Sequence, residues 1–219
     1  RDWSSDVCSS DLNPLQYAVG RLALKVKAEN NSLYDAKGKL VDISTTGLNL
    51  TGIIVGNQPD VDFNFVPKDG STYDKAIYDK FSAVNVNATA PTDFQNHTLV
   101  FETPTSGDNQ KVKIALEFEN NTGEDFEGVN GIIPPNTKFY LIAELDPTQV
   151  TNASLQQVFK QDYFTTVELT IKQGNKDSDN SKGLGGAYNV IPDLRNTALE
   201  LGLSVNLEWQ EGLTFTISI

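Results

Sequence analysis

Apolar and polar side chains alternate in short runs along most of the chain, the pattern of β-strands with one buried face. In Arg21–Lys27, Leu22, Leu24 and Val26 are expected to point inward and the charged side chains outward. A glycine, Gly52, lies inside the second run and indicates a bulge there. Strands are predicted over nine runs: Arg21–Lys27, Leu48–Val55, Val61–Val66, Thr98–Phe101, Lys111–Phe118, Lys138–Glu144, Tyr163–Ile171, Leu201–Leu207 and Leu213–Ile219.

Turn-forming residues separate these runs. Clusters of Gly, Asn, Asp and Pro occur, for example, at Asn57–Asp60, Thr105–Asn109 and Asn120–Gly123. Helical pattern is scarce, and only Tyr73–Phe81 and Ser154–Phe159 are predicted to form a helical turn or two. Many short strands with turns between them predict an all-β fold, an antiparallel β-sandwich.

The last run reaches the final residue of the sequence without a charge or a proline. One face would carry Thr214, Thr216 and Ser218. Two interpretations stay open: the run pairs within its own sandwich, as a hairpin with Leu201–Leu207 through the loop Glu208–Gly212, or it pairs with a sheet of another subunit. The apolar face, which is the candidate donor surface for the second case, consists of Leu213, Phe215, Ile217 and Ile219.

Size and charge limit the classes of protein to which the chain can belong. The 219 residues can bury a substantial core, and no apolar run approaches the roughly 20 residues of a membrane-spanning helix. With 17 basic and 29 acidic residues the net charge is −12. We therefore predict that the protein does not bind nucleic acid, because phosphate contacts need clustered Lys and Arg.

The first twelve residues differ from the rest. They contain the near-repeat Ser-Ser-Asp-Val and Ser-Ser-Asp-Leu, and they resemble translated sequencing-adapter sequence. The chain also contains no Met. We therefore expect residues 1–12 not to be native, and residues 13–219 to form one domain of a longer protein.

Residues for catalysis are few. His97 is the only histidine and the only cysteine, Cys8, lies in the excluded segment, so triads and multi-His metal sites are ruled out. The segment Asp177–Asn180 resembles the start of a calcium loop but lacks its glycine and its closing acid. The acidic pairs Asp60/Asp62 and Glu124/Asp125 are weak candidates for a glycosidase couple. We predict no enzyme activity, and no catalytic, cofactor-binding or metal-binding residues.

Several ordered motifs across residues 13–219 resemble the Bacteroidales fimbrillins, the type V pilins of major and minor fimbriae. The most specific are Val158–Tyr163, Ala187–Arg195 and Leu199–Val205, followed by Glu208-Trp209. Earlier segments with the same resemblance are Ala18–Leu22, Leu50–Asn57, Ile77–Asp79, Gly131–Asn136 and Lys138–Ala143.

The resemblance implies a transthyretin-like sandwich and a role in assembly. Fimbrillins have two such domains, are exported as lipoproteins, and lose their first strand to a trypsin-like protease. The emptied groove then accepts the C-terminal strand of a neighbour. This chain resembles the C-terminal domain, with the N-terminal domain and its lipid anchor upstream. Arg21 is a conceivable protease target, but its place in an alternating strand favours a structural role.

The resemblance thus implies a structural subunit of a fimbria on the bacterial outer membrane, whose partners are other fimbrial subunits. The alternative is a fimbrial tip or anchor protein, or a free-standing adhesin that binds a host glycan or protein. For that alternative, Trp209, Tyr73 and Tyr78 are candidates for stacking on sugars.

Overall fold

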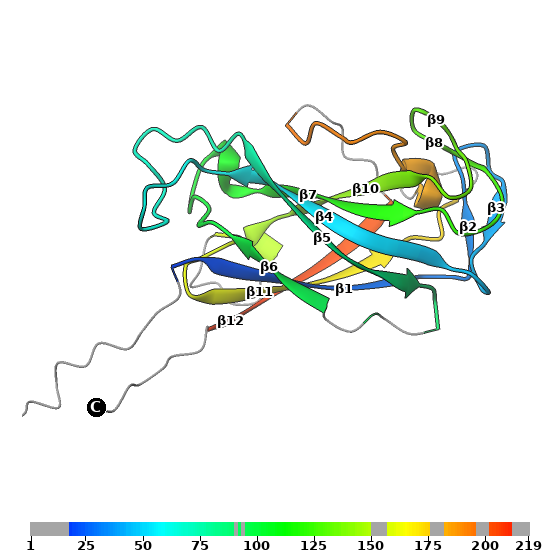
Figure 1. The fold of residues 1–219 in the computed structure, drawn as a ribbon, viewed down its shortest axis with the longest axis horizontal. Helices are drawn as coiled ribbons and strands as arrows, with labels where there is room; N and C mark the ends of the chain where they lie inside the picture. The colour runs from blue at the N-terminus through cyan, green and yellow to red at the C-terminus, as the bar shows by residue number, and fades with distance from the viewer. Residues whose placement is uncertain are drawn as a thin grey trace, which may run out of the picture.

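A computed structural model describes residues 18–89, 92, 95–149, 157–175, 182–195 and 202–211. Two four-stranded sheets pack face to face (Figure 1). One sheet has the order β12-β11-β1-β6 and the other β10-β7-β4-β5. The strands of the first sheet are β12 (Leu203–Glu211), β11 (Tyr163–Ile171), β1 (Gly20–Ala28) and β6 (Gln95–Val100). Those of the second sheet are β10 (Lys138–Leu145), β7 (Val112–Glu119), β4 (Leu48–Gln58) and β5 (Lys75–Val86).

Two small hairpins and three single-turn 3₁₀ helices complete the described part of the fold. The hairpins lie together at one end of the sandwich (Figure 1). They are formed by β2 (Ser32–Tyr34) with β3 (Leu40–Asp42), and by β8 (Phe126–Gly128) with β9 (Gly131–Ile133). The helices are η1 (Asp108–Gln110), η2 (Pro147–Gln149) and η3 (Gly183–Gly186).

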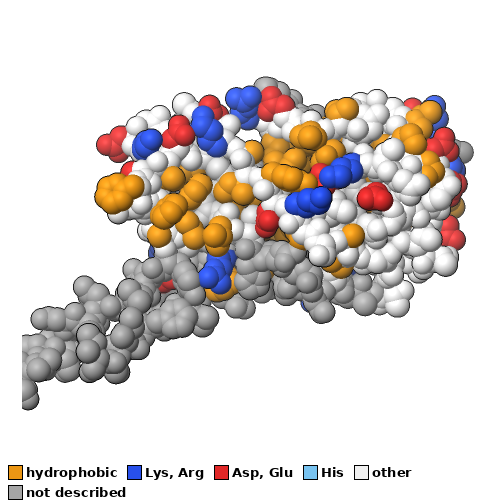
Figure 2. Space-filling model, viewed as in Figure 1, with side chains coloured by type: hydrophobic (Ala, Val, Ile, Leu, Met, Phe, Trp, Pro, Cys, Tyr) orange, Lys and Arg blue, Asp and Glu red, His pale blue; other side chains and the backbone are white. Residues whose placement is uncertain are grey.

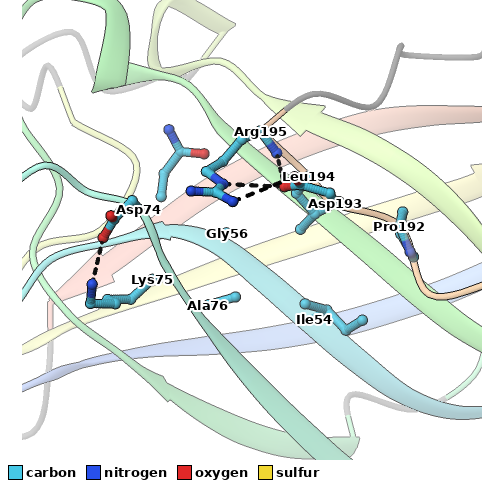
Figure 3. Close-up of a pocket in the computed structure, with 10 residues that line it drawn as sticks. Ile54, Gly56, Asp74, Lys75, Ala76, Pro192, Asp193, Leu194 and Arg195 are labelled. Atoms are coloured by element: carbon cyan, nitrogen blue, oxygen red, sulfur yellow. Dashed lines mark hydrogen bonds and ion pairs between the residues drawn. The ribbon is translucent and has the colours of Figure 1, made fainter.

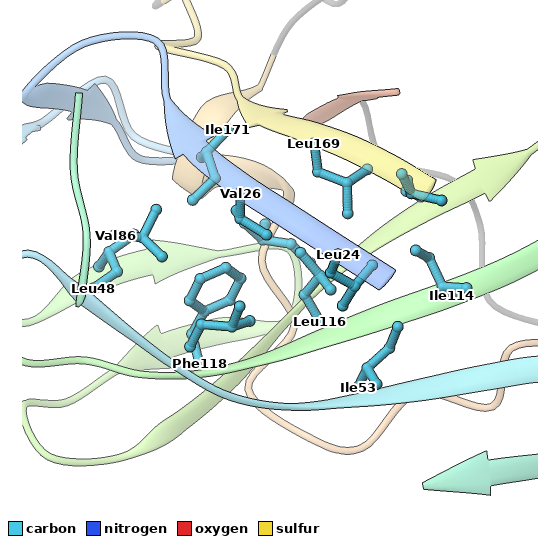
Figure 4. Packing of buried hydrophobic residues seen from close by; sticks show 14 of the residues in the cluster. Leu24, Val26, Leu48, Ile53, Val86, Ile114, Leu116, Phe118, Leu169 and Ile171 are labelled. Carbon is cyan, nitrogen blue, oxygen red and sulfur yellow. The ribbon is translucent and has the colours of Figure 1, made fainter. Parts of the chain in front are cut away.

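The core lies between the sheets because each strand turns its alternate apolar side chains inward. Leu24 and Val26 of β1 point toward Leu116 and Phe118 of β7 (Figure 4). Phe118 also stacks on Phe139 of β10, with ring centroids 5.3 Å apart. The predicted all-β sandwich is therefore confirmed.

Pairing is antiparallel in both sheets except between β1 and β11. These two strands run parallel, from Arg21↔Phe164 to Ala28↔Ile171. The bulge predicted at Gly52 is confirmed, since the register of β4 shifts between Leu50 and Gly52 against both of its neighbours.

One predicted strand and one predicted helical turn were wrong. Val61–Val66 is a loop rather than a strand, because the Asp62 carboxylate accepts hydrogen bonds from the backbone N–H of Asn64 and Val66 and turns the chain. Tyr73–Phe81 is not helical: from Lys75 onward it belongs to β5. Ile77 and Phe81 are four residues apart, and this spacing fits a helix and a strand equally well.

The turn predicted at Ser154–Phe159 is only partly described. Residues 157–159 are not helical, and residues 154–156 lie outside the described part. Within that part, no helix has the length and apolarity that a membrane crossing requires.

Candidate functional site

The strand that precedes the terminal run is longer than predicted. β12 pairs with β11 without a break from Leu203↔Ile171 to Glu211↔Tyr163. The loop predicted at Glu208–Gly212 was therefore wrong, because residues 208–211 are ladder residues of the strand. The polar residues at 208, 210 and 211 favour a turn in the sequence, but an edge strand also tolerates polar and charged residues.

β12 is an edge strand of its sheet, with β11 as its neighbour. An edge strand carries backbone N–H and C=O groups along its outer side that are available for pairing. The candidate donor residues Leu213, Phe215, Ile217 and Ile219 begin two positions after its last residue and lie outside the described residues.

The start of β1 and the end of β12 lie at the same end of the sandwich (Figure 1). Arg21 of β1 is level with Phe164 of β11, which is level with Gln210 of β12. Since neighbouring strands are about 4.8 Å apart, the two strand ends are separated by about 10 Å. The segments before residue 20 and after residue 211 thus begin side by side.

Arg21, considered as a protease target, lies within β1. Its guanidinium stands over the Phe164 ring, 5.3 Å from the centroid, and packs on the outer face of the sheet. This contact agrees with the structural role that the strand pattern favours.

A second place of interest is a groove on the outer face of the other sheet. The loop that follows η3 crosses this face, and Leu194 packs there with Ala115, Tyr140 and Ile142. Tyr188 holds the loop through two backbone hydrogen bonds with Tyr140, each 2.9 Å long.

Beside Leu194 the loop leaves an open space of about 380 Å³ between itself and the strands β4 and β5 (Figure 3). Gly56 and Ala76 contribute almost no side chain to this space, which is why it stays open. A second hollow of about 320 Å³ continues from it past Tyr73 and shares Asp74 and Arg195 with the first. Together these hollows form the groove.

Charged side chains line both sides of the groove. On one side Lys75 forms ion pairs with Asp74 at 2.8 Å and with Asp60 at 3.9 Å. On the other side Arg195 pairs with Asp193 at 3.2 Å. The hydrogen bond with Asp74 raises the pKa of Lys75, and that with Asp193 raises the pKa of Arg195, so both remain cationic. Alternating carboxylates, cations and amides, with Tyr73 at one end, suit a polar ligand rich in hydroxyl groups.

A buried carboxylate links the four strands of this sheet. Glu117 of β7 is only 3% exposed. Its Oε1 accepts hydrogen bonds from Thr51 Oγ1 at 2.8 Å, Tyr78 OH at 3.0 Å and Lys138 Nζ at 2.7 Å. Its Oε2 accepts one from Tyr140 OH at 3.1 Å. We call these five residues the Glu117 network.

Burial alone would raise the pKa of Glu117, but the hydrogen bonds from Lys138, Thr51 and the two tyrosines outweigh it and hold the pKa below its ordinary value. The Tyr140 pKa is raised, first by burial and then by the negative charge of Glu117. The network therefore contains an ionised carboxylate and neutral tyrosines. Sequence reasoning missed Glu117, because an outward Glu in an alternating strand normally faces solvent.

The other residues singled out from the sequence do not converge on one site. Tyr73 borders the groove, Tyr78 belongs to the Glu117 network, and Trp209 lies in the β12 ladder opposite Thr165. Asp62 caps its own loop, while Glu124 and Asp125 pair with Lys39.

His97 lies in β6, and its side chain is not described; Asp177–Asn180 lies outside the described residues. Among the residues that the structure describes, no group of three or more His, Cys, Asp or Glu could hold a metal ion.

Comparison with known proteins gives only distant similarity. No family model matches the chain, and no curated protein matches it. A candidate cell adhesion protein of Bacteroides eggerthii DSM 20697 aligns with a TM-score of 0.45 and 12% identity, over 90% of this chain and 57% of that one. A candidate cell adhesion protein of Parabacteroides distasonis ATCC 8503 aligns with a TM-score of 0.45 and 10% identity, over 87% and 52%. The chain spans little more than half the length of either.

Proposed function

We propose that this protein is a structural subunit of a cell-surface fimbria on a bacterial outer membrane, assembled by β-strand donation between subunits. The donor is the segment after β12, with Leu213, Phe215, Ile217 and Ile219 as the side chains that enter the acceptor. Its partners are other copies of the chain or accessory fimbrial subunits.

The observation that carries this proposal is the continuous ladder of β12 up to Glu211. A hairpin back onto β12 requires a turn of at least two residues. Because residues 208–211 are already strand, such a turn has to use Gly212 and Leu213. Pairing within the same subunit would thus place Leu213 in the turn and leave three apolar side chains in the strand. Pairing with another subunit keeps all four in the strand.

The expected energy is sufficient for a stable polymer contact. Burial of a large apolar side chain contributes about 1.5–3 kcal/mol. Four of them contribute roughly 6–12 kcal/mol before the cost of ordering the segment is subtracted. The backbone ladder of the donor satisfies the unpaired groups of the acceptor edge in addition.

The test is a chain that ends after Gly212. We expect it to remain a folded monomer by circular dichroism and to form no polymer by electron microscopy or on a denaturing gel run without heating. Replacing Leu213, Phe215, Ile217 and Ile219 by Ser should have the same effect. The matched control replaces Thr214, Thr216 and Ser218 by Ala and should assemble. Normal assembly of the shortened chain refutes donation, and unfolding of the shortened chain shows that the segment belongs to its own sandwich.

The groove supports the alternative, an adhesin or tip protein that binds a host glycan. Its carboxylates, amides and cations can hydrogen-bond sugar hydroxyls, and Tyr73 offers a ring for stacking. A glycan array with the purified chain tests this function. Saturable binding that is lost in both Tyr73→Ala and Arg195→Ala supports it, and the absence of binding on the array counts against it.

A further inference from the structure

An exposed aromatic loop lies at the end of the sandwich where β12 ends, next to β6, which is the opposite edge strand of the same sheet. We define the aromatic loop as Val61–Pro67. Phe63 at its tip is 90% exposed, and Phe65 and Val66 are about half exposed. Contiguous apolar exposure of this kind marks a contact site. Figure 2 shows apolar side chains gathered over this end of the molecule.

Hydrogen bonds fix the loop in this conformation. Asp62 Oδ1 accepts from Asn64 N–H at 2.8 Å and from Val66 N–H at 3.0 Å, and Asp62 N–H donates to the Val66 carbonyl at 2.9 Å. Phe65 takes a left-handed backbone conformation with φ of 64°, which is unfavourable for an aromatic residue. These hydrogen bonds thus hold the loop with Phe63 in solvent, and backbone strain of this kind is concentrated at functional sites.

The loop joins a wider apolar surface at the end of β6. The Phe65 ring stacks on Phe101 with centroids 6.2 Å apart. Leu99 is two residues before Phe101, is more than half exposed, and is level with Arg21 of β1. We call Phe63, Phe65, Val66, Leu99 and Phe101 the aromatic surface.

The position of the aromatic surface indicates which molecule contacts it. Val100 at the end of β6 pairs with Gly20 at the start of β1. From β6 to the end of β12 there are three strand spacings, about 14 Å. The eight residues after Glu211 span at most about 28 Å. A subunit bound through these residues is therefore held against the same end of the sandwich.

We propose that the aromatic surface, with Phe63 at its centre, is a contact between copies of this chain in the polymer. This inference rests on the proposed function and adds a second interface to it. Copies that each carry a charge of −12 repel one another. The five uncharged side chains of the aromatic surface, at the end of the sandwich where β12 ends, give such copies an apolar contact.

Photo-crosslinking tests this contact. The crosslinking amino acid benzoylphenylalanine replaces Phe63 in the intact chain. As the control it replaces Ile132 in the distant β8–β9 hairpin, where the side chain is about half exposed. Irradiation of the polymer should link two copies through position 63 and not through position 132. A polymer without links at position 63, or with equal links at both positions, overturns the inference while leaving strand donation intact.

The same experiment with a chain that ends after Gly212 separates the two proposals. Loss of polymer and of links together supports both. Links at position 63 that persist without the segment while the polymer is lost also support both, and links together with normal polymer support the contact and refute donation. An intact chain that gives neither polymer nor links refutes both.

A charge at the tip provides a second measurement. Phe63→Asp should weaken association between copies roughly 10- to 100-fold in analytical ultracentrifugation, without changing the midpoint of urea unfolding. Ile132→Asp should change neither quantity. Association of Phe63→Asp within twofold of the unmodified chain contradicts the inference.

Discussion

Thr98 Oγ1 of β6 donates a 2.7 Å hydrogen bond to Asp79 Oδ2 of β5, and it thereby joins the edge strands of the two sheets. The Thr98 side chain is 2% exposed. The backbone hydrogen bonds of the β-ladders join strands within a sheet, so a contact between facing strands of the two sheets depends mainly on side chains. On this side of the sandwich the Thr98–Asp79 bond is such a contact.

Thr98→Val keeps the shape of the side chain and removes the hydroxyl. We expect the free energy of unfolding to fall by about 1–2 kcal/mol, because the Asp79 carboxylate loses a buried donor. Urea unfolding followed by tryptophan fluorescence measures the change. Thr170→Val, at a partly exposed position of β11, should change the unfolding free energy by less than about 0.5 kcal/mol. An equal loss of unfolding free energy in both variants would show that the effect comes from replacing any threonine and not from the bond to Asp79.

Glu117→Gln tests the Glu117 network. The amide keeps the volume but loses the charge that attracts Lys138, and its NH₂ group faces hydroxyls that donate to the carboxylate. We expect a loss of about 1–3 kcal/mol in unfolding free energy. The control is Glu119→Gln on the same strand, where the side chain is partly exposed. Equal stability of the Glu117 variant and the unmodified chain would show that the network contributes nothing.

The same network predicts acid sensitivity. The folded state lowers the Glu117 pKa below the unfolded value of 4.5. The stabilisation is therefore fully present above pH 4.5 and is lost as the pH falls through the lower folded pKa. The urea midpoint of the unmodified chain should drop between pH 5 and pH 3, and the drop should be smaller in Glu117→Gln. Parallel pH curves for the two proteins would rule out this role of Glu117.

Gly128→Ala tests the backbone contact at Ala187 that holds the loop over the groove. A Cβ at position 128 would overlap the carbonyl oxygen of Ala187, which also accepts a 2.8 Å hydrogen bond from Val129 N–H. Displacement of Ala187 should cost about 1–3 kcal/mol and accelerate tryptic cleavage after Arg195. Gly70→Ala, which has open space around it and a φ of 74°, should lose only about 1 kcal/mol and leave that cleavage rate unchanged.

The strands with one fully buried face could be predicted from sequence. In β1 and β11 the core removes alternate side chains from water, so the alternation in the sequence and the burial in the fold largely coincide. The strand prediction for the aromatic loop was wrong for a local reason. Its apolar residues alternate, but the Asp62 side chain accepts backbone hydrogen bonds that turn the chain, so no strand forms.

The candidate sites could not be predicted, because they depend on strand order. The Glu117 network brings Thr51, Tyr78 and Lys138 to one carboxylate from three other strands, and nothing in the pattern of any single strand indicates its neighbours. The groove likewise needs Arg195 to lie across from Asp74, which are more than a hundred positions apart in the sequence. The donor residues were identified from the sequence, and their role stays a prediction.

The adjacent ends of β1 and β12 have a mechanical consequence. A tensile force applied between residues 20 and 211 acts across the strands, because both points lie at one end of the sandwich. Hydrogen bonds of a ladder then break one pair at a time, starting at Glu211↔Tyr163, as in unzipping rather than shear. A fibre in flow is under tension. It would resist that tension only if the force entered this domain through a contact other than the ends of β1 and β12.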